Sequence, residues 1–143
     1  MRATPATRRD FTWFTSLTTR WSDNDVYGHM NNTKHYQVFD TAVNSYLLEA
    51  GLIDLGESET VFLVVETGCH YFGEMGFPDL VTAGIRVSDL GTSSVRYEIG
   101  LFRNDDTTTS AQGHFVHVQV AREGRRPIAL GENARKQLGT LQS

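Results

Sequence analysis

The residue types best suited to chemistry gather in residues 20–32, which read RWSDNDVYGHMNN. This segment contains two carboxylates, Asp23 and Asp25, and one imidazole, His29, which are side chains that serve as general bases or nucleophiles. It runs into a stretch of helical period, and the N-terminus of a helix exposes unpaired N–H groups that can stabilise a developing oxyanion. A carboxylate beside such amides is suited to acyl transfer to water.

Most of these residues also have a purely structural explanation. Asp25 could simply cap the loop and the following helix, although its motif favours a catalytic role. Asp23 is expected to bond loop amides or Arg20, and His29 could do no more than order the turn. Gly28 is best explained by a backbone conformation or a close approach that other residues would not tolerate.

The element before this segment is predicted to be a strand. Residues 11–21 alternate between two faces, and threonine and aromatic residues are frequent among them. One face is expected to carry Phe11, Trp13, Leu17 and Trp21.

The element after it is predicted to be a helix. Apolar residues recur at steps of three and four between residues 36 and 50, which is the period of an amphipathic helix. The N-cap is expected at Asn31 or Asn32, and Gly51 is expected to end the helix.

The rest of the chain is predicted to be mainly strands. They cover residues 61–72, 81–88, 95–101 and 114–120, and a short helix is expected at 132–138. Since short loops join these strands, successive strands are expected to be antiparallel neighbours. One long helix is available to cover the apolar face of the sheet. The sequence therefore predicts an α+β domain whose sheet curls around a central helix.

The size and charge of the chain limit the class of protein. Its 143 residues are expected to form one domain, residues 1–143, in which residues 1–10 are flexible. A net charge of −4 argues against nucleic acid as the main partner. Cys69 is the only cysteine, and the sequence has neither an apolar leader nor an 18-residue apolar window. These features predict a cytoplasmic protein with no membrane span.

Residues 20–36 resemble the motif R-x-x-D-x-D-x-x-G-H-V-N-N-x-x-Y of the hotdog-fold thioesterases, in the 4-hydroxybenzoyl-CoA thioesterase-like group. Met30 replaces the valine, and the matching residues are Arg20, Asp23, Asp25, Gly28, His29, Asn31, Asn32 and Tyr36. Two later pieces agree, L-G-T-S-S-V at residues 90–95 and R-R-P-I at residues 125–128. The resemblance implies a hotdog fold, in which a five-stranded antiparallel sheet wraps around one long helix.

The same resemblance implies hydrolysis of an acyl-CoA thioester to a free acid and CoA. Asp25 would be the general base or nucleophile, the backbone N–H at or near Asn32 would hold the oxyanion, and His29 would orient the loop. The resemblance also implies a homodimer or a dimer of dimers (a homotetramer), and no cofactor apart from the CoA of the substrate. Plant acyl-carrier-protein thioesterases have Asn where this chain has Tyr27, so the acyl-CoA branch is the better match.

Residues expected to bind the substrate lie inside and outside the motif. They are Tyr27, Gly28, Asn31, Tyr36, Glu66, Ser94 and Arg96. Glu66 interrupts an apolar strand, so it either lies at an exposed edge or faces the site. Arg96 is one of several arginines that could receive the CoA phosphates, because a guanidinium binds phosphate bidentately.

No metal site is expected. His114 and His117 are three residues apart on a predicted strand, so they should point to opposite faces. The motifs of zinc hydrolases, P-loop NTPases and serine esterases are absent from the sequence. Two other functions stay open: a hotdog hydratase or dehydratase acting on enoyl or 3-hydroxyacyl thioesters, and a non-catalytic acyl-thioester binding module. The D-x-D run fits the first poorly, and the carboxylate of Asp25 argues against the second.

Overall fold

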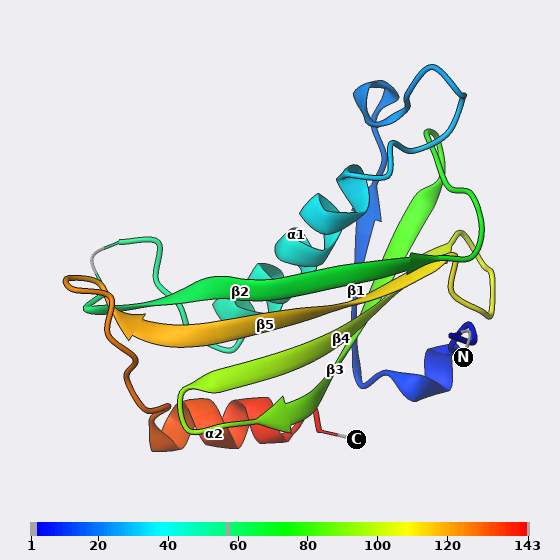
Figure 1. Cartoon of the computed structure of the whole chain (residues 1–143). Helices are drawn as coiled ribbons and strands as arrows, with labels where there is room; N and C mark the ends of the chain where they lie inside the picture. The colour runs from blue at the N-terminus through cyan, green and yellow to red at the C-terminus, as the bar shows by residue number, and fades with distance from the viewer. Residues whose placement is uncertain (1–2, 57, 143) are drawn as a thin grey trace.

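The structure is a computed structural model that describes residues 3–56 and 58–142. Its strands are β1 Trp13–Thr18, β2 Thr60–Tyr71, β3 Leu80–Leu90, β4 Ser94–Arg103 and β5 Ala111–Ala121, and its α-helices are α1 Lys34–Glu49 and α2 Glu132–Gly139. The strands form one antiparallel sheet in the order β1-β3-β4-β5-β2. The sheet curves around α1 (Figure 1), which confirms the predicted α+β class and the five-stranded sheet around one long helix.

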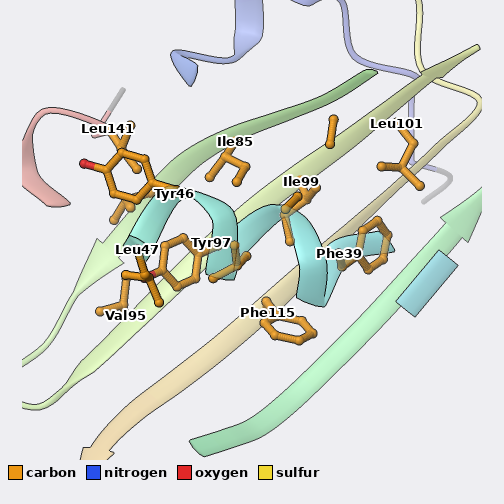
Figure 2. Close-up of a cluster of buried hydrophobic side chains, with 14 of the residues drawn as sticks. Phe39, Tyr46, Leu47, Ile85, Val95, Tyr97, Ile99, Leu101, Phe115 and Leu141 are labelled. Atoms are coloured by element: carbon orange, nitrogen blue, oxygen red, sulfur yellow. The ribbon is translucent and has the colours of Figure 1, made fainter. Parts of the chain in front are cut away.

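Helix α1 crosses the sheet on an apolar stripe. The buried residues of the helix are His35, Phe39, Ala42, Val43, Tyr46 and Leu47. They pack on the inward side chains of the sheet, among them Ile85, Tyr97, Ile99 and Phe115 (Figure 2). This contact is the core of the protein, and it fixes the position of the N-terminal end of α1.

The start of α1 differs slightly from the prediction. The N-cap is Thr33, rather than Asn31 or Asn32. Asn31 instead precedes the helix, where its Oδ1 accepts hydrogen bonds from the Thr33 N–H at 2.9 Å and the Thr33 hydroxyl at 2.7 Å. The predicted end is close, since the C-cap is Ala50 and Gly51 follows it at a φ of +72°.

Strand β1 is shorter than predicted. Trp13 faces α1, where its ring meets that of Tyr46 edge to face at 5.4 Å. Phe11 lies before the strand and packs against Gly84, which alternates with inward residues of β3 and so lies on the outer face of the sheet. Trp21 lies after the strand in a 3₁₀ turn and is 79% exposed. The prediction that Phe11 and Trp21 share a face with Trp13 is wrong, because β1 begins after Phe11 and ends before Trp21.

The N-terminal segment, whose flexibility stays a prediction, also contacts the sheet. From residue 3 onward it runs beside the sheet, where the Ala6 carbonyl oxygen accepts a hydrogen bond from the Thr109 N–H at 3.0 Å. The Arg8 guanidinium lies over the Phe102 ring at 4.7 Å. These contacts hold the segment against the outer face of the sheet.

One connection crosses the sheet instead of joining neighbours. β3, β4 and β5 are successive antiparallel neighbours, as predicted. β2 pairs with β5, however, and β3 pairs with β1. Residues 72–79 therefore connect one edge of the sheet to a strand near the other edge, and they pass beside the segment that precedes α1. None of the helices in the described ranges is long and apolar enough to span a membrane.

Candidate active site

The chemically rich segment folds into a small hairpin between β1 and α1. Asn24 and Met30 form an antiparallel bridge, and the Asp25 N–H donates a hydrogen bond to the His29 carbonyl oxygen at 3.0 Å. Gly28 closes the loop with a φ of +86°, while nothing lies within 4 Å of the position that a Cβ would take. The backbone conformation, and not a shortage of space, therefore explains this glycine.

The two carboxylates of the hairpin have different surroundings. Asp23 is 8% exposed, and its two oxygens accept hydrogen bonds from the Arg20 N–H at 2.8 Å and from Arg20 Nη2 at 3.1 Å. This confirms the structural role predicted for Asp23. Asp25 uses Oδ1 to accept a hydrogen bond from the Tyr27 N–H at 2.9 Å. Within the described part of the chain, its Oδ2 makes no hydrogen bond, so one oxygen is free for chemistry.

The connection between β2 and β3, residues 72–79, contacts the hairpin through hydrogen bonds of its backbone. The Met30 N–H donates to the Met75 carbonyl oxygen at 2.6 Å, and the Phe77 N–H donates to Asn24 Oδ1 at 3.0 Å. Gly76 lies so close to the hairpin that an added Cβ would be 2.8 Å from Asn24 Oδ1. A side chain at position 76 would therefore push the two loops apart.

His29 lies between the hairpin and this connection. Its Nδ1 is 3.3 Å from the Met30 carbonyl oxygen, and its Nε2 is 3.7 Å from Glu74 Oε1. Both contacts fit a residue that orders the loop, so a role for His29 in orientation stays a prediction.

The start of α1 leaves one backbone donor free. Four of the five amides of residues 30–34 are used, by the acceptors Met75 O, Asp23 O, Asn31 Oδ1 and Asn31 O. The fifth is the Asn32 N–H, which has no hydrogen-bond partner among residues 3–56 and 58–142. The free amide is thus the one predicted to hold an oxyanion.

A pocket of about 330 Å³ opens beside this amide, between the start of α1 and the end of β2. Its lining includes Asn32, His29 and Tyr71. His35 also lines it; the residue is 3% exposed and its Nδ1 has no partner in the described ranges. Burial lowers the pKa of His35, so this imidazole is neutral at pH 7.

A second pocket, of about 270 Å³, lies between α1 and β1. Arg20, Asp23 and Lys34 are among its lining residues. The carboxylate in this pocket is already bonded to Arg20. The free amide of Asn32 therefore favours the pocket at β2 as the place for a reacting carbonyl group.

Three further predicted residues lie near the hairpin or in α1. Tyr27 is 80% exposed on the hairpin. Asn31 shapes the turn before α1, as described above. Tyr36 is half-buried in the first turns of α1, where its ring meets that of Phe39 edge to face at 6.0 Å.

The remaining predicted residues lie on the sheet. Glu66 and Arg96 project from the outer face, where Glu66 Oε2 is 3.3 Å from Arg96 Nη1 and 2.8 Å from His114 Nε2. Ser94 begins β4, beside Gly91 of the preceding turn. Within the described residues, no hydrogen bond or ion pair connects Glu66, Ser94 or Arg96 to the hairpin. Within a single chain, these three residues therefore lie in a different region from Asp25.

The two histidines of β5 point to opposite faces, as predicted. His114 is paired with Glu66 on the outer face, whereas His117 is 2% exposed beneath Phe62. Among the described residues, no three His, Cys, Asp or Glu side chains are grouped in a way that could hold a metal ion.

Sequence reasoning missed two residues that support the hairpin and the start of α1, Tyr71 and Gly76. Tyr71 donates a hydrogen bond from its hydroxyl to the Asn32 carbonyl oxygen at 2.6 Å, across 39 positions of sequence. No local pattern marks such a contact. Gly76 carried a weak signal, since it lies in a loop rich in glycine and proline.

Comparison with known proteins gives consistent matches over nearly the whole chain. Residues 19–138 match the thioesterase-like superfamily. The PA5185 protein of Pseudomonas aeruginosa PAO1 is 44% identical, with 98% of each chain covered and a TM-score of 0.95. The Slr0204 protein of Synechocystis, a 1,4-dihydroxy-2-naphthoyl-CoA thioesterase, is 13% identical with a TM-score of 0.80, covering 88% of this chain and 94% of that one. The SAV2348 protein of Staphylococcus aureus, solved in complex with CoA, is 19% identical with a TM-score of 0.81, covering 91% and 85%.

Proposed function

The chain belongs to the thioesterase-like superfamily and has its hotdog-type fold, and from this we propose that it is an acyl-CoA thioesterase. The observation that carries the proposal is that one short segment, residues 25–32, holds two groups without a hydrogen-bond partner among the described residues. Asp25 Oδ2 is free to take a proton or to attack, and the Asn32 N–H is free to stabilise negative charge. A carboxylate and an oxyanion donor are the two groups that thioester hydrolysis requires.

In the first form of the reaction, Asp25 acts as general base. Its Oδ2 takes a proton from water while the water oxygen attacks the thioester carbonyl carbon. The negative charge moves to the carbonyl oxygen, which the Asn32 N–H stabilises. Collapse of this intermediate breaks the C–S bond, and the proton passes from Asp25 to the sulfur, which gives a carboxylic acid and CoA.

In the second form, Asp25 acts as nucleophile. Its oxygen attacks the carbonyl carbon and the CoA thiolate leaves, which produces a mixed anhydride. Water then hydrolyses the anhydride, which releases the carboxylic acid and regenerates the Asp25 carboxylate, and the remaining proton of the water passes to the thiolate to give CoA. The same amide serves both forms, because both pass through an oxyanion at the same carbonyl oxygen.

CoA is proposed as the carrier of the acyl group. The support comes from the SAV2348 protein, whose structure contains CoA, and from Slr0204, whose name states an aromatic acyl-CoA substrate. Arg96 stays a proposed contact for the CoA phosphates, together with Ser94 and Glu66, if a partner subunit brings that region to the pocket.

A homodimer is proposed as the working assembly. β2 is an edge strand of the sheet, and Val64, Val65 and Tyr71 along it are 44%, 60% and 45% exposed. Pairing two copies of β2 would satisfy its free backbone groups. The pocket opens at the end of the same strand, so a partner there would help to enclose it.

The proposed function is tested with a panel of acetyl-, hexanoyl-, palmitoyl- and benzoyl-CoA, with release of free thiol as the measurement. Wild type should release thiol from at least one substrate, and Asp25→Asn should reduce kcat by roughly 100-fold or more, because the amide cannot accept the proton or attack. Asp106→Asn is the matched control on an exposed turn, and it should keep wild-type activity. Thiol release by wild type that does not exceed that of Asp25→Asn would contradict the proposal. Loss of the conjugated absorbance of crotonyl-CoA without thiol release would instead indicate a hydratase.

A further inference from the structure

Tyr71 at the end of β2 bonds to the peptide next to the free amide of Asn32, although the two residues belong to different elements. We infer that Tyr71 is a positioning residue, which fixes the Asn32 N–H in the direction that the oxyanion requires. The inference rests on the proposed thioesterase function, since it assigns a role within that reaction.

Asn32 lies between two peptide groups, and hydrogen bonds hold both of them. The Asn31 carbonyl belongs to the peptide that contains the Asn32 N–H, and it accepts a hydrogen bond from the Lys34 N–H at 2.9 Å. The next peptide is held at both ends, because the Asn32 carbonyl accepts from Tyr71 at 2.6 Å and the Thr33 N–H donates to Asn31 Oδ1 at 2.9 Å.

The hydrogen bond from Tyr71 differs from the other two because its donor belongs to a distant element. The other two are made within residues 31–34, so they move with the start of the helix. The Tyr71 hydroxyl comes from the sheet and ties this start to the end of β2. Without it, the peptide that follows Asn32 would be held on one side only, and the dihedral angles on both sides of the Asn32 Cα would be less restricted.

The Tyr71 side chain is itself held in place. Its ring meets the ring of His35 edge to face, with centroids 4.8 Å apart, and His35 is buried in the first turn of α1. Desolvation and the neighbouring thiol of Cys69 raise the pKa of Tyr71 well above its ordinary value. The hydroxyl therefore stays protonated and donates throughout the neutral and mildly alkaline range.

Positioning of this kind acts on turnover more than on binding. An oxyanion donor contributes when it lies at the correct distance from charge that develops in the transition state. The ground-state thioester carbonyl carries less charge and depends less on that geometry. Loss of the Tyr71 hydroxyl should accordingly reduce kcat and leave KM largely unchanged.

Tyr71→Phe tests this, because it removes the hydroxyl and keeps the ring. The matched control is Tyr46→Phe, since the Tyr46 hydroxyl donates to another backbone carbonyl, that of Gln137, at 2.9 Å near the opposite end of α1. The substrate is the acyl-CoA of the panel that wild type hydrolyses fastest. We expect a fall in kcat of roughly tenfold for Tyr71→Phe, with KM within about twofold of wild type. Tyr46→Phe should lower the thermal unfolding midpoint without changing kcat.

The possible results separate this inference from the proposed function. If wild type releases thiol and Tyr71→Phe has the kcat of Tyr46→Phe, the positioning role is overturned and the thioesterase function stands. A rise in KM with unchanged kcat would also overturn it, because that pattern indicates a substrate contact. If wild type releases no thiol from any substrate, the proposed function fails, and the role assigned to Tyr71 fails with it.

Discussion

Asp23 and Asp25 are separated by one residue, but their carboxylates have different surroundings and therefore different roles. Asp23 is buried and both of its oxygens are bonded to Arg20, so it holds the entry to the hairpin. Asp25 is partly exposed and bonds through one oxygen to its own loop. The hairpin thus uses its first carboxylate for structure and leaves the second for chemistry.

His117 gives a prediction for stability at low pH. It is 2% exposed among the rings of Phe62, Tyr97 and Phe115, and burial lowers its pKa to about 4. The unfolded chain binds the proton near the ordinary value of 6.5, so it takes up more protons than the folded chain between pH 6.5 and 4. Folding stability should therefore fall as the pH is lowered through this range, by up to roughly 3 kcal/mol from this residue.

The measurement is urea unfolding of wild type and His117→Phe at pH 7.5 and pH 4.5. The loss of unfolding free energy between the two pH values should be smaller in His117→Phe, and any constant effect of the substitution cancels in this difference. His70→Gln, which changes an exposed histidine, should behave as wild type. An equal loss in wild type and His117→Phe would rule out this explanation.

The functional residues of the hairpin could be predicted from the sequence, whereas the residues of other elements that contact it could not. Asp25, Gly28 and the amide at Asn32 belong to one short segment, and both their spacing and the chemistry of helix starts were visible in the sequence. The contacts of Tyr71 with Asn32 and His35 depend on how β2 is positioned against the start of α1. A register between distant elements depends on the packing of the whole core, so no local pattern reports it.

The contact between α1 and β5 shows how closely the helix approaches the sheet. A Cβ on Gly113 would collide with the Phe39 ring and with the carbonyl oxygen of Gly68. Gly113→Ala should therefore destabilise the fold by roughly 2–3 kcal/mol, because the ring and the strand cannot both move away without loss of packing. Thermal or urea unfolding measures this change.

Gly131→Ala is the control for the glycine substitution itself. Gly131 is the N-cap of α2, with an ordinary negative φ and nothing within 4 Å of its Cβ position, so its replacement should cost less than about 1 kcal/mol, from the loss of a favourable N-cap residue. The double variant Gly113→Ala/Phe39→Leu should recover part of the loss, since the smaller side chain makes room. A Gly113→Ala protein as stable as Gly131→Ala would show that the helix lies further from the sheet.

Helices and strands were the most predictable level of the fold. The period of apolar residues located α1 and the four later strands, because each buries one face. The boundaries of β1 and the crossover of residues 72–79 were not predictable in this way. Alternation continues outside β1 although the backbone leaves the sheet, and the choice of neighbour for β2 depends on contacts between strands that are far apart in the sequence.

At the scale of the whole molecule, the free edge of β2 gives a prediction for assembly. Val65 lies in the β-bulge of this strand, between Val64 and Glu66, and is 60% exposed. Val65→Lys should convert the proposed dimer to a monomer, because a lysine on an edge strand opposes pairing of two edges. Sedimentation velocity measures the mass of the species in solution.

Ser16→Lys provides the comparison, since Ser16 is exposed on β1, the other edge strand of the sheet. It should leave the dimer intact. Thiol release should fall together with the dimer in Val65→Lys if the partner helps to enclose the pocket. A wild-type protein that sediments with the mass of one chain would contradict the proposed assembly.

The separation of β2 from its partner also has a consequence for biosynthesis. The ribosome makes residues 60–71 well before residues 111–121, with which they pair. At about 5–20 residues per second, roughly 3–10 s pass between completion of the two strands. During this interval the apolar run at residues 61–65 has no native neighbour, and it is followed directly by the charged Glu66. A charge next to such a run is a feature that opposes aggregation of exposed apolar segments.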